Sequence, residues 1–388
     1  MKNKIVVHHV GGRNGSTSFP MSSILKNDFV VVLYEPDTDC LEHAKNNVAA
    51  SDIVLPYCLG KNNNEIGYLN VNYDPYTSSL LKSNQKYSSY YNLGFADPGI
   101  YIDYVYGETR KTMEQLKIET ITLDKILEND NVPSPDVLCL DTQGTEYEIL
   151  EGASNALLNV VMIICEVSFT DIYENQKLFG DVSRLLTSKG FEFASFLNLS
   201  EASPCRVPIS MRGKRMLMEG DACFFKPIEQ LETDLSDDEF LLAATKLAFL
   251  TLKLGYIENA VKIISNQKIQ NFIYSHNINV KYFDFLREFI KILNSEKQVY
   301  LPTFKERYSF EQSKNRFKID ASEEMPEENN TEAKIISCKK KKQKNFFLRP
   351  FLSRIKRSFL FSPMENLFIN HGLYDTACLI KQNRKKFT

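Results

Sequence analysis

The stretch VLCLDTQGTEYEILEGA, Val137–Ala153, decides the fold. An apolar run from Val137 to Leu140 ends in Asp141, and the chain then turns at Gly144 and places Glu146 at the start of an amphipathic segment. A short apolar run followed by a turn and an amphipathic helix is typical of a buried parallel strand with its crossover helix. Because open α/β sheets bind ligands at the carboxyl ends of their strands, the two acids either cap this turn or face a ligand.

The same alternation recurs from the first residue to about residue 227. Apolar, β-branched runs occur at Ile5–Val10, Phe29–Glu35, Ile53–Leu59, Val137–Leu140, Val160–Val167, Phe191–Leu197 and Ala222–Phe225. Helical patterns lie between them at Cys40–Asn47, Thr145–Leu158 and Phe179–Ser188, the last followed by Gly190. Short apolar runs that alternate with helices indicate a sheet covered on both faces. The sequence therefore predicts an α/β, doubly wound, mostly parallel seven-stranded sheet over residues 1–227, with a C-terminal all-α extension.

A long polar insert interrupts this domain at residues 62–113. Nine tyrosines fall in it: Tyr68, Tyr73, Tyr76, Tyr87, Tyr90, Tyr91, Tyr101, Tyr104 and Tyr106. A connection of this length is typical of a lid or a binding element. The tyrosine ring offers a flat apolar face and a polar tip, which suits a sugar-like ligand. A small hairpin whose tyrosines pack on one another fits the pattern equally well.

The composition changes after residue 227. Ser236 and Glu239 have capping-box spacing before an apolar run that ends at Gly255, and this predicts a helix within a helical domain at residues 228–318. Residues 319–345 read as a disordered linker, first acidic and then basic, and residues 346–388 as basic amphipathic helices. The segment 339–361 predicts a peripheral contact with an anionic membrane or a partner protein. The apolar face of the amphipathic helix expected in this segment could equally pack on the chain's own domain.

Charge and hydropathy narrow the functional class. The net charge of the 388 residues is −2, which by itself indicates no class of partner, and no nucleic-acid partner is expected. The start, MKNKIVVHHVGG, has too short an apolar core for a signal peptide, and Phe240–Leu254 is too short to cross a bilayer. Eight cysteines without a CxxC pair are typical of small buried side chains in a reducing compartment. We expect a cytoplasmic protein, with membrane association only through residues 339–361.

The first apolar run leads into a glycine turn, HHVGGRNGSTSF. Gly11, Gly12 and Gly15 would let the backbone approach a ligand closely, and Glu35 ends the second strand 20 residues after Gly15. An acid at that place can accept hydrogen bonds from both hydroxyls of a ribose, which predicts an adenosine-containing cofactor. The alternative is ordinary turn chemistry with a surface acid. No metal is expected at His8 and His9, since adjacent strand residues point to opposite faces.

A nicotinamide cofactor is the third possibility. Its turn would favour GxGxxG, which this loop lacks. Tyr173 and Lys177, with Ser168 upstream, have the spacing of a short-chain NAD(P)-dependent dehydrogenase, but 19 tyrosines in a lysine-rich chain produce such a spacing by chance.

Several blocks of the chain, in order, resemble the FkbM family of S-adenosylmethionine-dependent methyltransferases. The matching positions are Leu123, Asp124, Asp141, Gly144, Glu146, Leu150, Gly152 and Ala153, together with Glu35-Pro36, TSSLL at 77–81 and GDACFFK at 220–226. The resemblance covers about residues 4–227. It implies a Rossmann-like fold, S-adenosylmethionine as the cofactor, and O-methylation of a hydroxyl on a sugar or polysaccharide precursor.

The resemblance also implies roles for individual residues. The expected cofactor-binding residues are His9, Gly11, Gly12, Arg13, Gly15, Glu35, Pro36 and Asp141. The expected catalytic residues are Asp141 and Glu146. The residues expected to contact a small-molecule or glycan acceptor are Gln143, Glu166, Tyr76 and Ser78. A carboxylate can take the proton of the acceptor hydroxyl. Three positions depart from the family pattern: His9 stands where it has an acid, Arg13 where it has Asn, and Gln143 where it has Glu. His9 and Arg13 favour the alternative of a catalytically silent relative that binds a nucleoside or glycan as an interaction module, whereas Gln143 keeps a hydrogen-bonding side chain and removes only a charge.

Overall fold

The computed structural model describes residues 3–11, 19, 24–37, 40–41, 45, 49, 52–97, 100–128, 131–275, 280–295 and 362–387. Met1–Ile290 and Pro363–Thr388 form one compact unit, and Lys291–Ser362 form a second. The basic segment 339–361 and the linker 319–345 lie outside the described residues. The domain boundaries at 227, 318 and 345 stay predictions.

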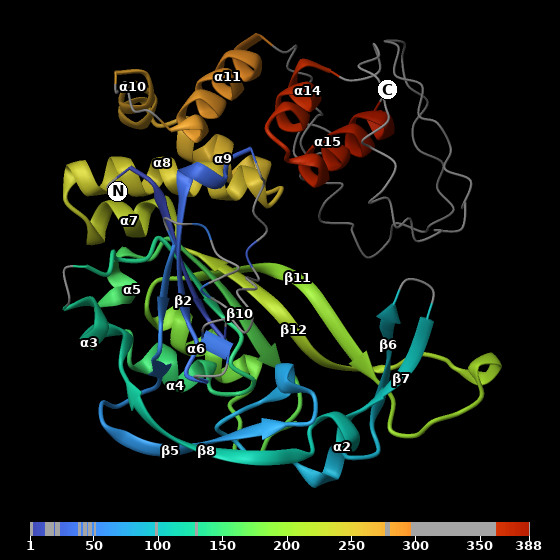
Figure 1. The fold of residues 1–388 in the computed structure, drawn as a ribbon. Helices are drawn as coiled ribbons and strands as arrows, with labels where there is room; N and C mark the ends of the chain where they lie inside the picture. Colours follow the sequence, from blue (N-terminus) through green and yellow to red (C-terminus); the bar gives the residue numbers. More distant parts are fainter. Residues whose placement is uncertain are drawn as a thin grey trace, which may run out of the picture. The chain divides into compact units, whose positions relative to one another are not determined.

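The centre of the first unit is a seven-stranded sheet in the order β11-β12-β10-β9-β1-β2-β3 (Figure 1). Its strands are β1 Ile5–Val10, β2 Phe29–Tyr34, β3 Ile53–Leu55, β9 Val137–Leu140, β10 Met162–Ser168, β11 Glu192–Ala202 and β12 Met216–Phe225. The pairs from β3 to β10 are parallel, and β12 runs antiparallel to both of its neighbours. The predicted fold class is therefore confirmed.

One predicted strand is wrong. The run Ile53–Leu59 divides into β3 and a short strand β4, Cys58–Leu59, which belongs to a different sheet. Pro56 stands at the division, and proline has no backbone N–H to donate to a strand ladder. The chain therefore leaves the central sheet at Pro56.

The single helix predicted over Thr145–Leu158 is also wrong. The structure has α4, Glu146–Glu151, and α5, Ala156–Asn159, with a break at Gly152. A Cβ on Gly152 would lie 2.2 Å from the carbonyl oxygen of Gly60, so the chain packs there against another backbone. The carboxylate of Asp124 then accepts hydrogen bonds from the N–H groups of Asn155 (2.9 and 3.1 Å) and Ala156 (2.8 Å), which starts the second helix.

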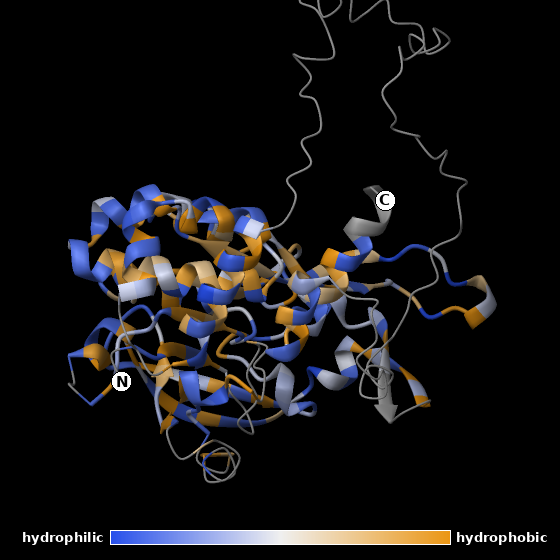
Figure 2. Cartoon of the chain, turned by 90° about the horizontal axis from the view of Figure 1, so that it is seen from above, coloured by the Kyte–Doolittle hydropathy of each residue, from blue (hydrophilic) through white to orange (hydrophobic). Residues whose placement is uncertain are grey.

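The core lies between the sheet and its covering helices. Those helices include α3, Leu123–Leu127, and α6, Phe179–Ser188, and α6 matches its predicted bounds. In Figure 2 the helices carry hydrophilic and hydrophobic residues in turn. Buried side chains of the strands and of α3 to α6 form one continuous cluster, which includes Val32, Leu138, Ile163 and Phe224. The unbroken apolar runs of the sequence thus reflect strands that are buried on both faces.

The tyrosine-rich insert is folded. It contains β5 Glu65–Asn72, two 3-10 turns at Pro75–Thr77 and Gln85–Tyr87, β6 Tyr91–Asp97, β7 Ile100–Val105, α2 Tyr106–Thr109 and the start of β8 Thr112–Ile121. Strands β4, β8 and β5 form a small sheet, and β6 and β7 form a hairpin. Tyr87 and Tyr90 pack edge to face at 5.0 Å, as the hairpin alternative expects, while Tyr73 and Tyr76 are exposed.

Helices follow the last strand. They are α7 Ile228–Asp234, α8 Asp237–Lys253, α9 Ile257–Ile264, α10 Gln267–Ser275, α11 Lys281–Ser295, α14 Pro363–Asn370 and α15 Tyr374–Phe387. The capping box of Ser236 with Glu239 starts α8, and Gly255 follows its end with a φ of 89°. None of the helices in these described segments has the length and apolar character needed to span a bilayer.

These helices contact the end of the sheet where the parallel strands begin. The Lys246 ammonium of α8 donates to both carboxylate oxygens of Asp136, at 2.7 and 2.8 Å, and Asp136 directly precedes β9. The same carboxylate accepts a 2.7 Å hydrogen bond from the N–H of Val6 in β1. The helices and the insert lie at opposite ends of the central strands (Figure 1). The insert therefore lies at the carboxyl ends of the strands.

The buried ion pair between Lys246 and Asp136 should be important for stability. We expect Asp136→Asn to lower the free energy of unfolding by about 3 kcal/mol, because a buried ammonium without its partner carries a large desolvation penalty. Urea unfolding would measure this loss. Glu151→Gln, which removes the more exposed pair with Lys61, serves as the control and should cost less than about 1 kcal/mol. Equal losses in the two variants would contradict the assignment.

Candidate functional site

A pocket opens at the carboxyl ends of β1, β2 and β9, and we call it the rim pocket. The empty space between its walls is about 820 Å³, including the part that is open to solvent. Its walls are Val10, Gly11, Tyr34, Glu35, Pro36, Tyr57, Cys58, Leu59, Leu69, Pro75, Tyr76, Ser78, Leu80, Asp141, Thr142, Gln143 and Thr145. A mostly apolar lining with a few polar groups is typical of a small-molecule site. The predicted residues Gly11, Glu35, Pro36, Tyr76, Ser78, Asp141 and Gln143 all lie in this wall.

Glu35 directly follows β2 and is 4% exposed. Its N–H donates to the carbonyl oxygen of Leu55, and one of its carboxylate oxygens accepts a 2.9 Å hydrogen bond from the N–H of Asp37. Both contacts fix the residue at the end of the strand. Its carboxylate therefore has a defined position in the wall, as a group that binds ribose hydroxyls requires.

Gly11 and Asp141 bring two neighbouring strand ends into close contact. The N–H of Asp141 donates to the carbonyl oxygen of Val10 at 3.0 Å. Gly11 has a φ of 91°, and a Cβ there would lie only 1.8 Å from the carbonyl oxygen of Asp141. Only glycine satisfies both conditions. The other predicted residues of this loop, Gly12, Arg13 and Gly15, lie outside the described residues.

Glu146 holds the loop after β9 from within. Its carboxylate accepts hydrogen bonds from the N–H of Thr142 (2.8 Å), the N–H of Gly144 (3.0 and 3.1 Å) and the hydroxyl of Thr142 (3.0 Å). The side chain is 4% exposed and is not part of the wall of the rim pocket. Burial raises the pKa of Glu146 from 4.5 to about 7, against the opposing effect of the N–H donors. The structure places this predicted catalytic residue as an anchor of the loop.

Gln143 adopts a conformation that is unusual for its residue type. Its φ is 58°, in the left-handed region, and its carbonyl oxygen accepts a 2.6 Å hydrogen bond from the Ser79 hydroxyl. The side-chain Nε2 donates to Asp141 Oδ1 at 3.0 Å and to Glu166 Oε2 at 2.7 Å. One amide group therefore bridges two carboxylates that belong to neighbouring strands, β9 and β10.

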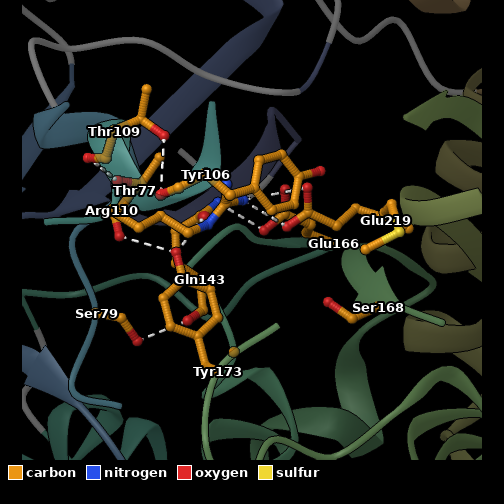
Figure 3. Close-up of polar contacts among 12 residues, drawn as sticks. Thr77, Ser79, Tyr106, Thr109, Arg110, Gln143, Glu166, Ser168, Tyr173 and Glu219 are labelled. Atoms are coloured by element: carbon orange, nitrogen blue, oxygen red, sulfur yellow. Dashed lines mark hydrogen bonds and ion pairs between the residues drawn. The ribbon is translucent and has the colours of Figure 1, made fainter. Parts of the chain in front are cut away.

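Behind this amide lies a buried polar cluster that ties the insert to the sheet (Figure 3). Arg110 pairs with Glu219 of β12 at 3.1 Å, and its guanidinium stacks 3.9 Å from the ring centre of Tyr106. The hydroxyl of Tyr173 lies 2.9 Å from Gln143 Oε1 and 2.8 Å from the carbonyl oxygen of Thr77. Burial, together with the charges of Asp141 and Glu219, holds the pKa of Glu166 well above its usual range.

The two histidines of β1 lie behind the wall. Burial lowers the pKa of each to about 4, so both are neutral at pH 7, although the charge of Asp141 acts in the opposite direction on His9. His8 Nε2 lies 2.8 Å from the carbonyl oxygen of Pro133, and its Nδ1 lies 2.9 Å from the hydroxyl of Tyr34. The predicted cofactor-binding residue His9 is 2% exposed and does not line the rim pocket.

The dehydrogenase-like spacing does not form a site in this fold. Tyr173 is fully buried in the polar cluster, whereas the Lys177 ammonium lies 5.8 Å from the ring centre of Tyr147. The Ser168 hydroxyl accepts a 2.8 Å hydrogen bond from Gln176. The three side chains thus have separate partners, and the nicotinamide alternative loses its evidence. Nor do the described segments bring together three His, Cys, Asp or Glu side chains as a metal site.

Several residues of the site were not identified from the sequence. Arg110 and Tyr173 give no local signal, because their partners lie 109 and 96 residues away along the chain. Glu219 and Asp221 do carry one: two acids spaced by two at the start of an apolar strand share one face.

Comparisons with known proteins agree with the resemblance seen in the sequence. Residues 9–193 match the family model described as the methyltransferase FkbM domain. A hexuronic acid methyltransferase of Haloferax volcanii is 31% identical over 87 residues, which are 21% of this chain and 36% of that protein. The chain therefore matches only about a third of the length of this curated relative.

Two solved structures are similar over part of the chain. An FkbM methyltransferase of Methylobacillus flagellatus is 14% identical with a TM-score of 0.32, covering 57% of this chain and 44% of its own. A magnesium protoporphyrin IX methyltransferase of Synechocystis, solved with bound S-adenosylmethionine, is 10% identical with a TM-score of 0.28, covering 57% and 70%. The order and direction of the strands in this chain define its fold class.

The contact between Gly11 and Asp141 predicts that one methyl group added at position 11 strongly lowers the stability of the fold. We expect Gly11→Ala to lower the free energy of unfolding by more than about 2 kcal/mol, because the new Cβ meets a backbone oxygen and a positive φ disfavours alanine. Chemical unfolding would measure it. In Gly180→Ala, the matched control, the added Cβ has no atom within 4 Å and the position is helical, so stability should be kept or slightly improved.

The raised pKa of Glu146 predicts a pH-dependent stability. The folded state holds this proton between pH 4.5 and about 7, so the contribution is fully present below pH 4.5 and is lost as the pH rises through about 7. We expect the difference in unfolding free energy between wild type and Glu146→Gln to fall by about 3 kcal/mol across this window. Urea titrations at several pH values would measure it. A constant difference would refute the raised pKa.

Proposed function

We propose, since residues 9–193 match the family model described as the methyltransferase FkbM domain, that the protein transfers the methyl group of S-adenosylmethionine to a hydroxyl group of a sugar or polysaccharide precursor. The observation that carries the proposal is the rim pocket, in whose wall Glu35 and Asp141 stand together. The ends of two non-adjacent strands thus contribute acids to one cavity. This is the arrangement that a nucleoside-binding sheet requires.

The residues present fit S-adenosylmethionine. Glu35 would accept hydrogen bonds from the two ribose hydroxyls. Pro36, Tyr57 and Leu59 supply apolar surface beside it, which suits a purine ring. Gly11 leaves the backbone of the β1 loop open to close approach, and the exposed tyrosine Tyr76 of the insert stands at the same pocket.

For methyl transfer the protein chiefly has to position the two reactants. When bound, S-adenosylmethionine supplies a methyl group on a positively charged sulfur, which a nucleophile can displace. Asp141 would accept the proton of the acceptor hydroxyl and so raise its nucleophilicity. Holding the reactants in line can supply several kcal/mol of the barrier.

Gln143 prepares Asp141 for this role. Its amide donates to Asp141 and to Glu166, and its own oxygen faces the Tyr173 hydroxyl. With three partners the side chain has little freedom to turn. Gln143 therefore serves as a positioning residue, and Glu146 as the anchor of the loop that carries both side chains.

The acceptor class rests on the partial relative and on the family resemblance. The matched relative is named for hexuronic acid, a sugar, although the alignment spans a minor part of either protein. The tyrosines of the insert, with Tyr76 at the rim pocket, suit a sugar ring. A sugar or polysaccharide precursor is therefore the acceptor that we favour.

A silent relative is the second candidate, favoured by His9. The family pattern has an acid at this position, whereas here a buried imidazole with a pKa of about 4 supplies no charge at neutral pH. Such a protein would bind a nucleoside or glycan and act as an interaction module. Asp141, which lines the rim pocket in front of the buried His9, would supply a negative charge in its place.

Cofactor binding tests the proposal directly. We expect calorimetry to detect binding of S-adenosylmethionine and of its demethylated product, S-adenosylhomocysteine. Glu35→Ala should weaken both about tenfold to a hundredfold, the usual effect of losing hydrogen bonds to a charged group.

Glu232→Ala is the matched control, because Glu232 is an exposed acid on α7, outside the rim pocket. Its affinity should equal that of wild type. An absence of binding at millimolar concentrations of both compounds would contradict the methyltransferase proposal. Wild-type affinity in Glu35→Ala would show that the ribose is held elsewhere.

A further inference from the structure

A second pocket opens on the same edge of the sheet, beyond Gln143 from the rim pocket. We call it the β10–β12 pocket. Its empty space is about 800 Å³, including the part open to solvent, and its wall includes Glu166 of β10, Asn198 of β11 and Asp221 of β12. The β6–β7 hairpin of the insert contributes Asn92. Three strands of the central sheet and the insert thus enclose one cavity.

The two pockets border each other at the Gln143 amide. It lines the rim pocket together with Asp141, and the same Nε2 donates to Glu166, which lines the β10–β12 pocket. A ligand in the β10–β12 pocket therefore lies one side chain away from the predicted proton acceptor. In an open α/β sheet this edge is where reactants meet.

The wall of the β10–β12 pocket carries four carboxyl groups and one guanidinium, that of Arg215, which pairs with the carboxylate of Glu201 at 3.7 Å. Glu166, Glu219 and Asp221 all contribute carboxyl groups. The Oδ1 atom of Asn92 is buried and has no hydrogen-bond partner among the described residues. A buried acceptor without a donor costs free energy, which a ligand that donates a hydrogen bond would recover.

The positions of these carboxyl groups also lower the stability of the fold. Glu166 and Asp221 stand directly opposite each other in the antiparallel pair of β10 and β12. Like charges directly opposite each other on two strands are destabilising. The ion pairs found in this part of the described chain join Glu219 to Arg110 and Glu201 to Arg215, and they include neither Glu166 nor Asp221. Burial above all, and next the charge of Asp141, raises the pKa of Glu166 and of Asp221.

From this arrangement we propose that the β10–β12 pocket is the acceptor site and that it accepts a polyhydroxylated compound that is neutral or carries an ammonium group, and disfavours one that carries a carboxylate. Hydroxyl and ammonium groups donate hydrogen bonds to Glu166, Asp221 and Asn92, whereas a carboxylate would add another like charge. The acceptor would then differ in charge from the hexuronic acid of the partial relative. This inference rests on the proposed methyl transfer.

Three probes that share a sugar ring and differ in charge test the inference. We would measure binding of methyl glucoside, methyl glucosaminide and methyl glucuronide to the full chain by ligand-observed NMR. The glucuronide should bind at least about tenfold more weakly than the other two, because a like charge in a partly buried site costs on the order of 1 kcal/mol or more. Equal or tighter binding of the glucuronide, or no binding of any of the three at tens of millimolar, would overturn the proposal.

Asp221→Asn locates the effect in the pocket. This variant should reduce the discrimination against the glucuronide severalfold. Glu192→Gln makes the same change of charge at an exposed position at the start of β11, away from the pocket, and should leave the ranking unchanged. Thermal unfolding shows whether each variant is folded. If Asp221→Asn is unfolded, the order of affinities of the three glycosides for the wild type still tests the proposal.

S-adenosylhomocysteine affinity separates this inference from the proposed function. It should be the same in Asp221→Asn and in wild type, since Asp221 does not line the rim pocket. Binding of S-adenosylhomocysteine without the expected ranking of glycosides would overturn only the acceptor inference. The reverse result would overturn the methyl transfer and leave a glycan-binding pocket.

Discussion

The amide group of Gln143 is the contact on which the site depends. It donates to Asp141 and to Glu166, two carboxylates that would otherwise repel each other at the ends of neighbouring strands. A positive φ at Gln143 and the hydrogen bonds from Ser79 and to Glu146 at either side of it fix the loop in the conformation that this bridge requires. A strained backbone of this kind persists where its surroundings determine it, and such places are commonly functional.

The two ends of the central sheet are covered by different elements because its central strands run in one direction. Parallel strands have distinct ends, and the α-helices that follow the sheet pack at the end where strands begin, through the pair of Lys246 with Asp136. The insert covers the other end, and Arg110 ties it there to Glu219. Both pockets lie between the insert and the strand ends. The insert is therefore part of the site and also part of the folded core, because Tyr87 and Tyr106 pack with Tyr173.

Local patterns predicted the elements that local interactions determine. The bounds of β1, β9 and α6 follow from apolar periodicity, and α8 follows from the capping box of Ser236 with Glu239. The predictions failed where one distant contact interrupts a pattern. The helix ends at Gly152, where the chain packs against Gly60, 92 positions earlier, and the carboxylate of Asp124, also distant along the chain, binds the N–H groups that begin the next helix. The run Ile53–Leu59 divides at Pro56, and its second half pairs with β8, a strand that the polar composition of the insert concealed.

The sequence by itself determined that acids follow buried strands, since Glu35 and Asp141 each directly follow an apolar run. It also indicated a glycine turn after the first strand, whereas the contact of Gly11 with the backbone of Asp141 follows only from the tertiary structure. Only the tertiary structure decided which acids share a cavity. Strand order brings Glu166 of β10 and Asp221 of β12 into one pocket and places Asp141, at the end of β9, beside Glu166, although up to 80 residues separate these acids along the chain. The physical reason is that pairing between distant strands depends on the packing of the whole sheet, and residue spacing carries no record of it.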